Sequence, residues 1–302
     1  AEAVKTGLSN GTIWALIALG YTLVYGIIEL INFAHGDLFM LGSVLSAVVI
    51  ESWFGANHSN PAGWIAFAVS MVLAMAFCAT INVGSELIAY RRLRRAPKLA
   101  PLITAVGISF IFQNVGNIWN GSAPASRNPV LPNYAWKITN TINIPWIAII
   151  SLLVTIPLLL ALSFIVKKTR AGKAMRATAQ DMDASRLMGI NVNSIIAFTF
   201  ALGGLMAGAA GALYVQSFQT TRYDAGFQLG LIAFTAAVLG GVGNLTGAVL
   251  GGLLIGVIQG LNDGAPHGLS QQWSQTVVFT ILILLMVFRP QGLLGKPVTE
   301  KV

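Results

Sequence analysis

The sequence predicts an all-α fold, a polytopic bundle of helices that span a membrane. Only 9% of the 302 residues are charged and 55% are hydrophobic, whereas a soluble chain carries roughly a quarter charged residues. Several apolar runs reach the ~20 residues that an α-helix needs to cross a ~30 Å hydrocarbon core. The strand alternation of outer-membrane barrels is absent. We therefore expect one transmembrane domain over 1–302, with the lipid bilayer as its solvent.

The chain contains about eight apolar segments. Residues 1–28 lack the pattern of a cleavable signal peptide and are predicted as the first span. Glycines four residues apart, as at Gly204 and Gly208 or Gly252 and Gly256, predict helix faces on which backbones approach closely. The seven simple runs are 4–28, 34–53, 62–90, 99–119, 144–166, 194–216 and 271–288.

The eighth segment, 229–262, is too long and too rich in glycine for one plain span. Gly240, Gly241, Gly243 and Asn244 disfavour a continuous helix, so two pieces, 229–241 and 245–262, are expected as a hairpin or re-entrant pair. Non-helical backbone at membrane depth survives only where protein or a water-filled cavity shields it. The break is therefore a candidate pathway element, and a kinked helix at an ordinary interface is the alternative.

The net charge of +8 reflects basic residues that gather in two short loops, at 91–98 and 167–186. Cytoplasmic loops collect Lys and Arg, so both loops are expected inside the cell and the N-terminus outside. Arg289 favours an inside C-terminal end, which requires the broken segment to cross twice. The charge thus indicates membrane topology, and no nucleic-acid partner is expected.

The segment RAGKAMRATAQDMDASRLMGIN, 170–191, carries four basic side chains. Each would cost roughly 2.5–3.5 kcal/mol near the centre of a span, so we assign 167–193 to a cytoplasmic loop. Two short helices are predicted: one that begins near Ala171, and one capped by Asp181 or Asp183 and ended by Gly189. The second is too short to be stable alone in water. It therefore needs a partner surface for Leu187 and Met188, unless the loop packs on its own bundle.

Polar residues inside or beside the apolar runs are the candidates for a substrate pathway. Asn32 and His35 lie in the segment 26–42, which charge counting places near the cytoplasmic side. Gln113 shares one helical face with Asn114 and Asn117, and interhelical hydrogen bonding is the ordinary alternative for such residues. The complete candidate set is Asn32, His35, Gln113, Gly241, Gly243 and Asn244.

The sequence contains no motif that points to an enzyme. There is no P-loop, no zinc-protease motif and no nucleophile elbow, and Cys78 is the only cysteine, so no catalytic residue, metal site or cofactor is expected. A proton- or sodium-coupled carrier would show buried acids in mid-span, and we expect no acid near the centre of any run.

Four stretches, taken together, resemble the bacterial high-affinity branched-chain amino-acid permease subunit. They are GYTLVYGIIELINFAHGDLFMLGS (20–43), RAGKAMRATAQDMDASRLMGINV (170–192), FTAAVLGGVGNLTGAVLGGLLIG (234–256) and FRPQGLLGK (288–296). The resemblance covers the whole chain. It implies a multi-pass subunit of an ATP-binding-cassette (ABC) importer in the bacterial inner membrane.

The resemblance also implies partners: a homologous second permease, two cytoplasmic ATPases and a periplasmic solute-binding protein that delivers branched-chain or other neutral amino acids. The loop would dock on an ATPase through Ala179, Asp181, Leu187, Met188, Gly189 and Ile190. The motifs leave open a family relative that carries urea or another small polar solute. A self-sufficient carrier or channel, or a structural membrane protein without a pathway, are the alternatives outside the family.

Overall fold

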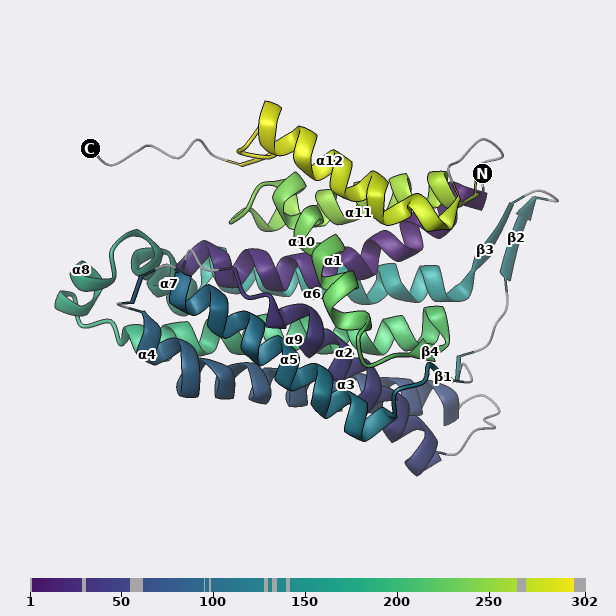
Figure 1. The fold of residues 1–302 in the computed structure, drawn as a ribbon, viewed down its shortest axis with the longest axis horizontal. Helices are drawn as coiled ribbons and strands as arrows, with labels where there is room; N and C mark the ends of the chain where they lie inside the picture. The colour runs from purple at the N-terminus through teal and green to yellow at the C-terminus, as the bar shows by residue number, and fades with distance from the viewer. Residues whose placement is uncertain are drawn as a thin grey trace.

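The computed structural model is a bundle of long helices that lie roughly side by side (Figure 1). It describes residues 2–28, 31–54, 62–94, 96–97, 99–127, 130–131, 135–139, 142–264 and 270–295. Figure 1 places α7 and α8 at one end of the bundle, and the N-terminus with β2 and β3 at the other.

The long helices follow the predicted runs within a few residues, and the all-α prediction is confirmed. Seven helices of the described ranges are long and apolar enough to cross a membrane, and α10 and α12 are shorter apolar helices. The principal helices are α1 (Glu2–Ile28), α2 (Ala34–Val49), α3 (Ala62–Ser85), α5 (Leu99–Asn120), α6 (Trp146–Lys168), α9 (Val192–Phe218), α10 (Ala225–Gly240), α11 (Leu245–Gly264) and α12 (Ser274–Phe288).

Short elements extend or connect these helices. A π-helical turn, η1 (Ile50–Phe54), continues α2, and η2 (Glu86–Tyr90) with α4 (Arg91–Leu93) continues α3. The remaining short helices are α7 (Arg170–Gln180), α8 (Met182–Leu187) and the 3-10 turn η3 (Gln271–Trp273). Two small antiparallel pairings join β1 (Ala125–Ser126) with β4 (Thr220–Thr221), and β2 (Ala135–Thr139) with β3 (Ile142–Pro145).

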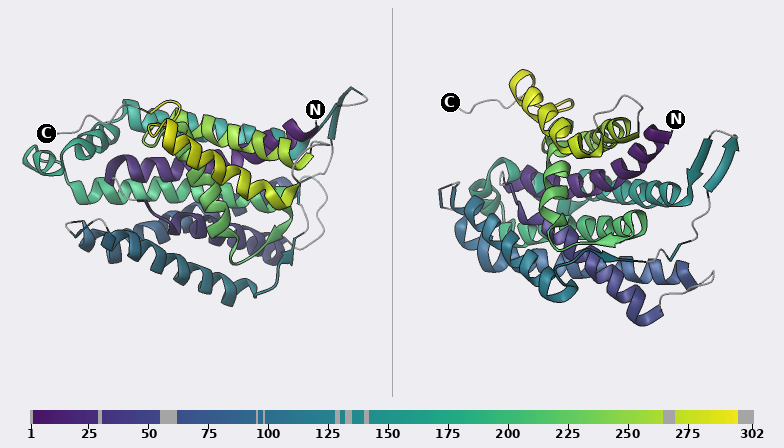
Figure 2. Two further views of the ribbon diagram at one scale, coloured as in Figure 1. Left: turned by 45° about the horizontal axis from the view of Figure 1, so that its top comes forward. Right: turned by 45° about the vertical axis from the view of Figure 1, so that its right-hand side comes forward.

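Helices of the core pack closely where one of them carries glycine, both at α1 and between α9 and α3. A Cβ added to Gly256 of α11 would lie 2.3 Å from Gly11 Cα of α1. In the same way, a Cβ on Gly208 of α9 would lie 2.4 Å from the carbonyl oxygen of Ala74 in α3. The predicted close approach at these glycines is confirmed. The outer helices α3, α5 and α6 leave most of their surface uncovered, as spans that meet lipid or another subunit do (Figure 2).

The glycine-rich segment forms a helical hairpin, as predicted. α10 and α11 pack so closely that a Cβ on Gly251 would lie 2.0 Å from the carbonyl oxygen of Ala236. Gly241 and Gly243 in the turn have φ values of 102° and 88°, which only glycine adopts without strain. Asn244 then caps α11, because its Oδ1 accepts hydrogen bonds from the N–H groups of Thr246 and Gly247.

The chain after α12 returns to cover this turn. The N–H of Leu293 donates to the carbonyl oxygen of Leu239 at 2.8 Å, and that of Leu294 to Gly240 at 3.1 Å. Asn244 Nδ2 completes the contact by donating to the carbonyl oxygen of Leu294 at 2.8 Å. These bonds satisfy carbonyl groups that the end of α10 leaves open. Lys296 and Lys301 lie outside the described residues.

Candidate functional site

The polar segment between α6 and α9 folds into two short helices. At the start of α7, Thr169 Oγ1 accepts a hydrogen bond from Gly172 N at 3.1 Å. At the start of α8, Asp181 Oδ1 accepts from the N–H groups of Asp183 and Ala184, both at 2.9 Å. The predicted boundary and the Asp181 cap are confirmed.

Gly189 ends α8 in the predicted way. Its φ of +81° is left-handed. Its N–H donates to the carbonyl oxygen of Arg186, and the N–H of Ile190 donates to that of Ser185, both at 3.0 Å. These two bonds are the Schellman closure of a helix end. α8 is therefore closed by hydrogen bonds at both ends.

One side of the α7–α8 unit packs on the bundle and the other projects from it. Ala179 and Met182 pack against the core, and Ser185 is buried. Leu187 and Met188, by contrast, are 89% and 82% exposed. Two adjacent large apolar side chains thus form the exposed tip of α8, a helix that lies at one end of the bundle (Figure 1).

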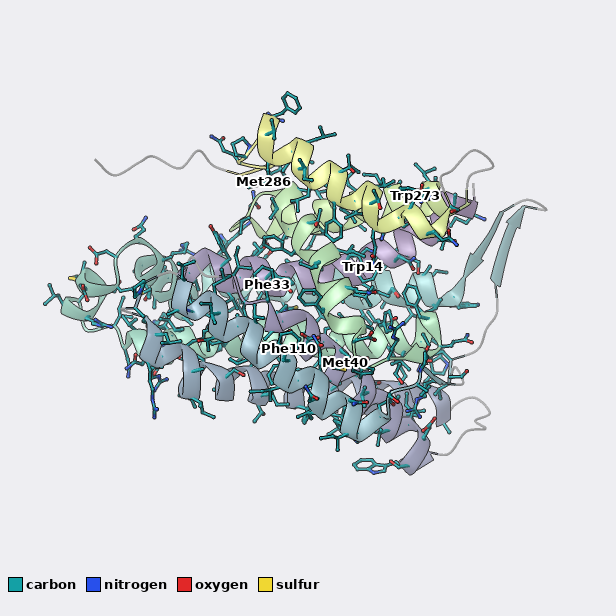
Figure 3. The ribbon with its side chains drawn as sticks, in the orientation of Figure 1. Trp14, Phe33, Met40, Phe110, Trp273 and Met286 are labelled. Carbon is teal, nitrogen blue, oxygen red and sulfur yellow. The ribbon has the colours of Figure 1, made fainter. Side chains whose placement is uncertain are left out.

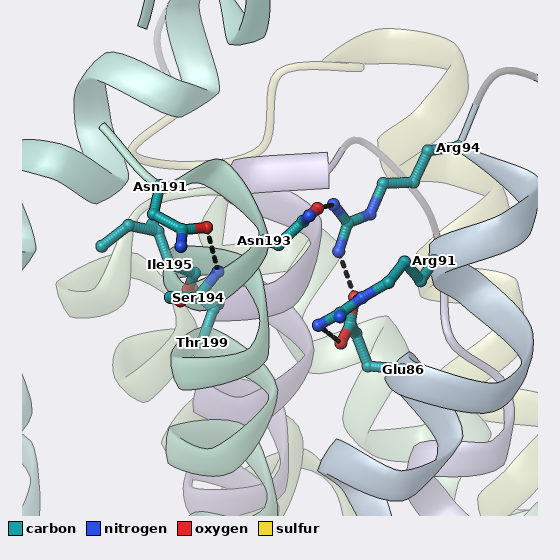
Figure 4. Close-up of polar contacts among 8 residues, drawn as sticks. All are labelled: Glu86, Arg91, Arg94, Asn191, Asn193, Ser194, Ile195 and Thr199. Carbon is teal, nitrogen blue, oxygen red and sulfur yellow. Dashed lines mark hydrogen bonds and ion pairs between the residues drawn. The ribbon is translucent and has the colours of Figure 1, made fainter. Parts of the chain in front are cut away.

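A buried ion-pair cluster joins the start of α9 to the end of α3 (Figure 4). The side chain of Glu86 is completely buried and pairs with Arg91 Nη2 at 3.0 Å and with Arg94. Arg94 also donates from Nη1 to Asn193 Oδ1 at 2.6 Å. Because Asn193 lies in the first turn of α9, the cluster fixes the helix that follows α8 to the α3 end.

Burial lowers the pKa of Arg94, and the Glu86 carboxylate opposes that shift. Sequence reasoning missed this cluster. Its signal is the acid Glu86 near the end of an apolar run, followed five and eight residues later by Arg91 and Arg94. Arg95 and Lys98, in the same basic loop, lie outside the described residues.

A cavity of about 340 Å³ opens between α2, α5 and α10. This lies within the range of roughly 300–1,000 Å³ that small-molecule sites occupy. Phe33 and Phe110, two of its wall residues, lie at about the mid-length of the bundle in Figure 3. The lining residues are Phe33, Val106, Ser109, Phe110, Gln113, Asp224, Phe227 and Gln228.

Asp37 lies behind this wall and orients its polar residues. Its Oδ2 accepts hydrogen bonds from Ser109 Oγ and, at 3.4 Å, from Gln113 Nε2. Asp37 lies in the first turn of α2, away from the centre of its own run, yet its carboxylate meets Ser109 in the middle of α5. The reason is that α2 begins inside the bundle, where the ring of His35 packs 4.8 Å from that of Tyr21 in α1.

A second, more polar cavity of about 300 Å³ shares Asp224 and Gln228 with the first. It is lined by Pro124, Tyr214, Thr220, Arg222, Asp224, Ala225, Gln228 and Leu229. Arg222 Nε pairs with Asp224 Oδ1 at 2.5 Å, and this carboxylate raises the pKa of Arg222. Thr220 lies in β4, toward the end where the N-terminus lies (Figure 1).

The predicted pathway residues fall in three different places. Gln113 lines the first cavity. Asn32 caps α2 and accepts a hydrogen bond from Tyr90 Oη at 2.8 Å. His35 fills the space that Gly20 leaves, where a Cβ would lie 2.1 Å from its Nε2. Both side chains are buried, and His35 packs against Tyr21 of α1.

Gly241, Gly243 and Asn244 lie away from both cavities. They form the turn beneath the C-terminal tail, beside Gly26 near the end of α1. Within the described ranges, no three His, Cys, Asp or Glu side chains come together to hold a metal ion.

The model of the family described as branched-chain amino acid transport system / permease component matches residues 3–287. The chain belongs to this family. It is 38% identical to the high-affinity branched-chain amino acid transport system permease protein LivH of Escherichia coli (strain K12), covering 100% of this chain and 97% of LivH. It is also 38% identical to the corresponding permease protein BraD of Pseudomonas aeruginosa, with the same coverage.

A solved structure supports the fold of the permease independently. The structure described as PsaBC from Streptococcus pneumoniae in complex with Fab matches with a TM-score of 0.50 and 17% identity, covering 96% of this chain and 92% of that one. At this identity the likeness concerns the fold alone.

Proposed function

We propose that this permease is a transmembrane subunit of an ABC importer in the bacterial inner membrane, and that it carries branched-chain or other neutral amino acids. A periplasmic binding protein delivers the substrate, and ATP hydrolysis on separate subunits drives transport. The proposal is supported by the relatives, which carry 38% identity over the full length of this chain.

The observation that carries the coupling part of the proposal is the tip of α8. The side chains of Leu187 and Met188 are exposed on a charged loop that faces water. Removing apolar surface of this size from water is favourable, so burial of the two side chains against a partner would stabilise the complex. A cytoplasmic ATPase with an apolar groove is the partner that such a tip fits. The conformation of the tip is fixed by hydrogen bonds at the two ends of α8, which involve Asp181, Gly189 and Ile190. Ala179 packs the α7–α8 unit against the core of the bundle.

In this mechanism α8 moves with the ATPases and transmits their movement to the spans. Its closed ends make it a rigid unit, and the chain after Gly189 continues directly into α9. The Glu86 cluster then connects α9 to α3. A homologous second permease packs against the uncovered outer helices α3, α5 and α6 and completes the substrate pathway. Closure of two ATPases thereby shifts the bundle between outward and inward openings.

The double variant Leu187→Asp and Met188→Asp tests the docking. Charged side chains at the tip cannot enter an apolar groove without losing their hydration. We expect the variant permease to reach the membrane but to lose co-purification of the ATPase subunits in mild detergent, together with ATP-dependent leucine uptake in proteoliposomes.

The matched control is Leu187→Met with Met188→Leu, which keeps the apolar surface and should retain both assembly and uptake. Normal ATPase co-purification with the double Asp variant would show that α8 is not the docking element. Leucine uptake by the isolated permease, without ATPases, would refute the importer assignment itself.

A further inference from the structure

We propose that the cavity between α2, α5 and α10 is a transient binding site for the transported amino acid, with Gln113 as the acceptor of the α-ammonium group and a phenylalanine wall for the apolar side chain. The inference rests on the proposed transport function and adds a location, a ligand chemistry and a selecting residue to it.

The side chain of Gln113 is held in one orientation by two hydrogen bonds. Its amide nitrogen donates both to Asp37 Oδ2, at 3.4 Å, and to Ser109 Oγ, at 3.3 Å. Since both bonds use Nε2, the amide oxygen Oε1 remains as an acceptor on a residue that lines the cavity. An ammonium group is a donor with three hydrogens and no acceptor, which matches that oxygen.

Acidic side chains lie in and behind one part of the cavity wall. Asp224 lies in its wall, and Asp37 lies directly behind Ser109 and Gln113. Arg222 pairs with Asp224 from the side of the neighbouring cavity and does not line this one. The polar side of the cavity therefore presents oxygen acceptors and acids, an environment that favours a cationic group and disfavours an acidic side chain.

Apolar side chains form the rest of the cavity wall. Phe33, Phe110 and Phe227 come from three different segments and converge on one space with Val106. Such a wall matches a branched aliphatic side chain and gives only modest discrimination between Leu, Ile and Val, because one methylene changes binding by a factor of roughly 10–200. The site thus selects neutral apolar amino acids as a class.

Asp37 acts here as a positioning residue. It is completely buried and reaches the cavity only through the side chains it holds. Gly226 allows α10 to approach this carboxyl group, since a Cβ there would lie 2.7 Å from Asp37 Oδ1. The contact brings the start of α10 close to α2 and α5, and Phe227 and Gln228 reach the cavity from there.

The site can be tested with a cysteine placed in the cavity wall, whose labelling is slowed by a bound ligand. The complex of permease and ATPase subunits is used without the binding protein. The only native cysteine, Cys78, is completely buried, so Val106→Cys supplies one reactive thiol in the cavity. Leucine should slow its labelling by a methanethiosulfonate reagent about tenfold, at roughly ten times the leucine Kd. The control Ser122→Cys, exposed and outside the cavity lining, should label at an unchanged rate.

Leucine analogues test the ammonium contact. Isoamylamine, which keeps the amine and the side chain, should protect Val106→Cys, and 4-methylpentanoate, which lacks the amine, should not. Adding Gln113→Ala should raise the leucine concentration for half-protection roughly ten- to a hundredfold, as expected for loss of a hydrogen bond to a charged group. Adding Asn114→Ala should leave it unchanged, because Asn114 Nδ2 bonds only to the carbonyl oxygen of Phe110 in its own helix.

Asp37→Asn should weaken protection less than Gln113→Ala, since an amide oxygen still accepts from Ser109. Equal protection by 4-methylpentanoate, an unreactive Val106→Cys, or an unchanged Gln113→Ala variant would overturn the site. ATP-dependent leucine uptake by the same complexes, measured after the binding protein is added, separates the two proposals. Uptake without protection rejects the cavity alone, and absence of uptake by the unmodified complex rejects the transport function.

Discussion

At the scale of single residues, Glu86 is a completely buried carboxylate that pairs with two arginines at the end of the bundle near α8. A buried carboxylate is stable only while its cationic partners remain. Arg94 is 8% exposed at its side chain and Arg91 35%, so the two partners are not equivalent. Arg94 also donates to Asn193, so it links the segment that follows α3 to the first turn of α9.

Glu86→Gln is expected to destabilise the permease by about 3–5 kcal/mol, because it leaves the Arg94 guanidinium buried without an opposite charge. Thermal unfolding in detergent measures the loss. Arg91→Gln is the matched control and should cost about 1 kcal/mol or less, since Arg91 is partly solvated.

The same variant tests the mechanical role of the cluster. If Glu86 and Arg94 transmit movement from α8, the assembled Glu86→Gln complex should hydrolyse ATP with less leucine transported per ATP. An unchanged transport-to-hydrolysis ratio in a complex that is clearly less heat-stable would restrict the cluster to a structural role.

At the scale of elements, the contact between α10 and α11 depends on glycine rather than on large side chains. Gly251→Ala places a methyl group 2.0 Å from the carbonyl oxygen of Ala236, so the helices must separate. We expect a loss of about 1–3 kcal/mol or more, measured as a lowered unfolding midpoint.

Gly107→Ala is the control, because a Cβ at that position meets no atom within 4 Å. In a helix interior this change should be neutral or stabilising by up to about 1 kcal/mol. Similar midpoints for the two variants would contradict the close packing of the hairpin.

The elements themselves were largely predictable from the sequence. Run length and hydropathy gave the spans, and the α8 ends followed from the local chemistry of Asp181 and Gly189. Depth was harder to predict, since a hydropathy run does not encode where a helix begins inside a bundle. α2 and α10 both begin within it, and for that reason charge counting on the segment 26–42 does not reveal the burial of Asp37 against α5 and α10.

The cavity was beyond sequence reasoning except at Gln113. Its wall combines Phe33, just before α2, with residues of α5 and of the start of α10. Residues such as Phe33 and Phe227 look like ordinary apolar positions in a chain that is 55% hydrophobic. The glycine break was predictable as a break. Its cover by Leu293 and Leu294 was not, because those contacts use backbone groups that any residue carries.

At the scale of the whole molecule, the arrangement of charges predicts the orientation in the membrane. α7, α8 and the Arg91–Arg94 turn share one end of the bundle, and the loop after α5 lies toward the other (Figure 1). Lys and Arg collect on the cytoplasmic side. The end that carries α8 should therefore face the ATPases.

Single-cysteine labelling of intact cells tests this orientation, in a background where buried Cys78 is silent. A membrane-impermeant maleimide should label Ser122→Cys from outside, and Leu187→Cys only after the membrane is permeabilised. Labelling of Leu187→Cys in intact cells would invert the topology and remove α8 from any cytoplasmic partner.

The hydrogen bonds that cover the α10–α11 turn can form only late in synthesis of the chain. Asn244 and its acceptor Leu294 are 50 residues apart in sequence. The ribosome therefore synthesises the α10–α11 hairpin well before the segment with Leu293 and Leu294, which covers its turn. Until Leu293 and Leu294 emerge, the carbonyl groups of Leu239 and Gly240 at the end of α10 lack these donors, and Asn244 Nδ2 lacks its acceptor, so a chain that ends before residue 293 leaves the turn uncovered.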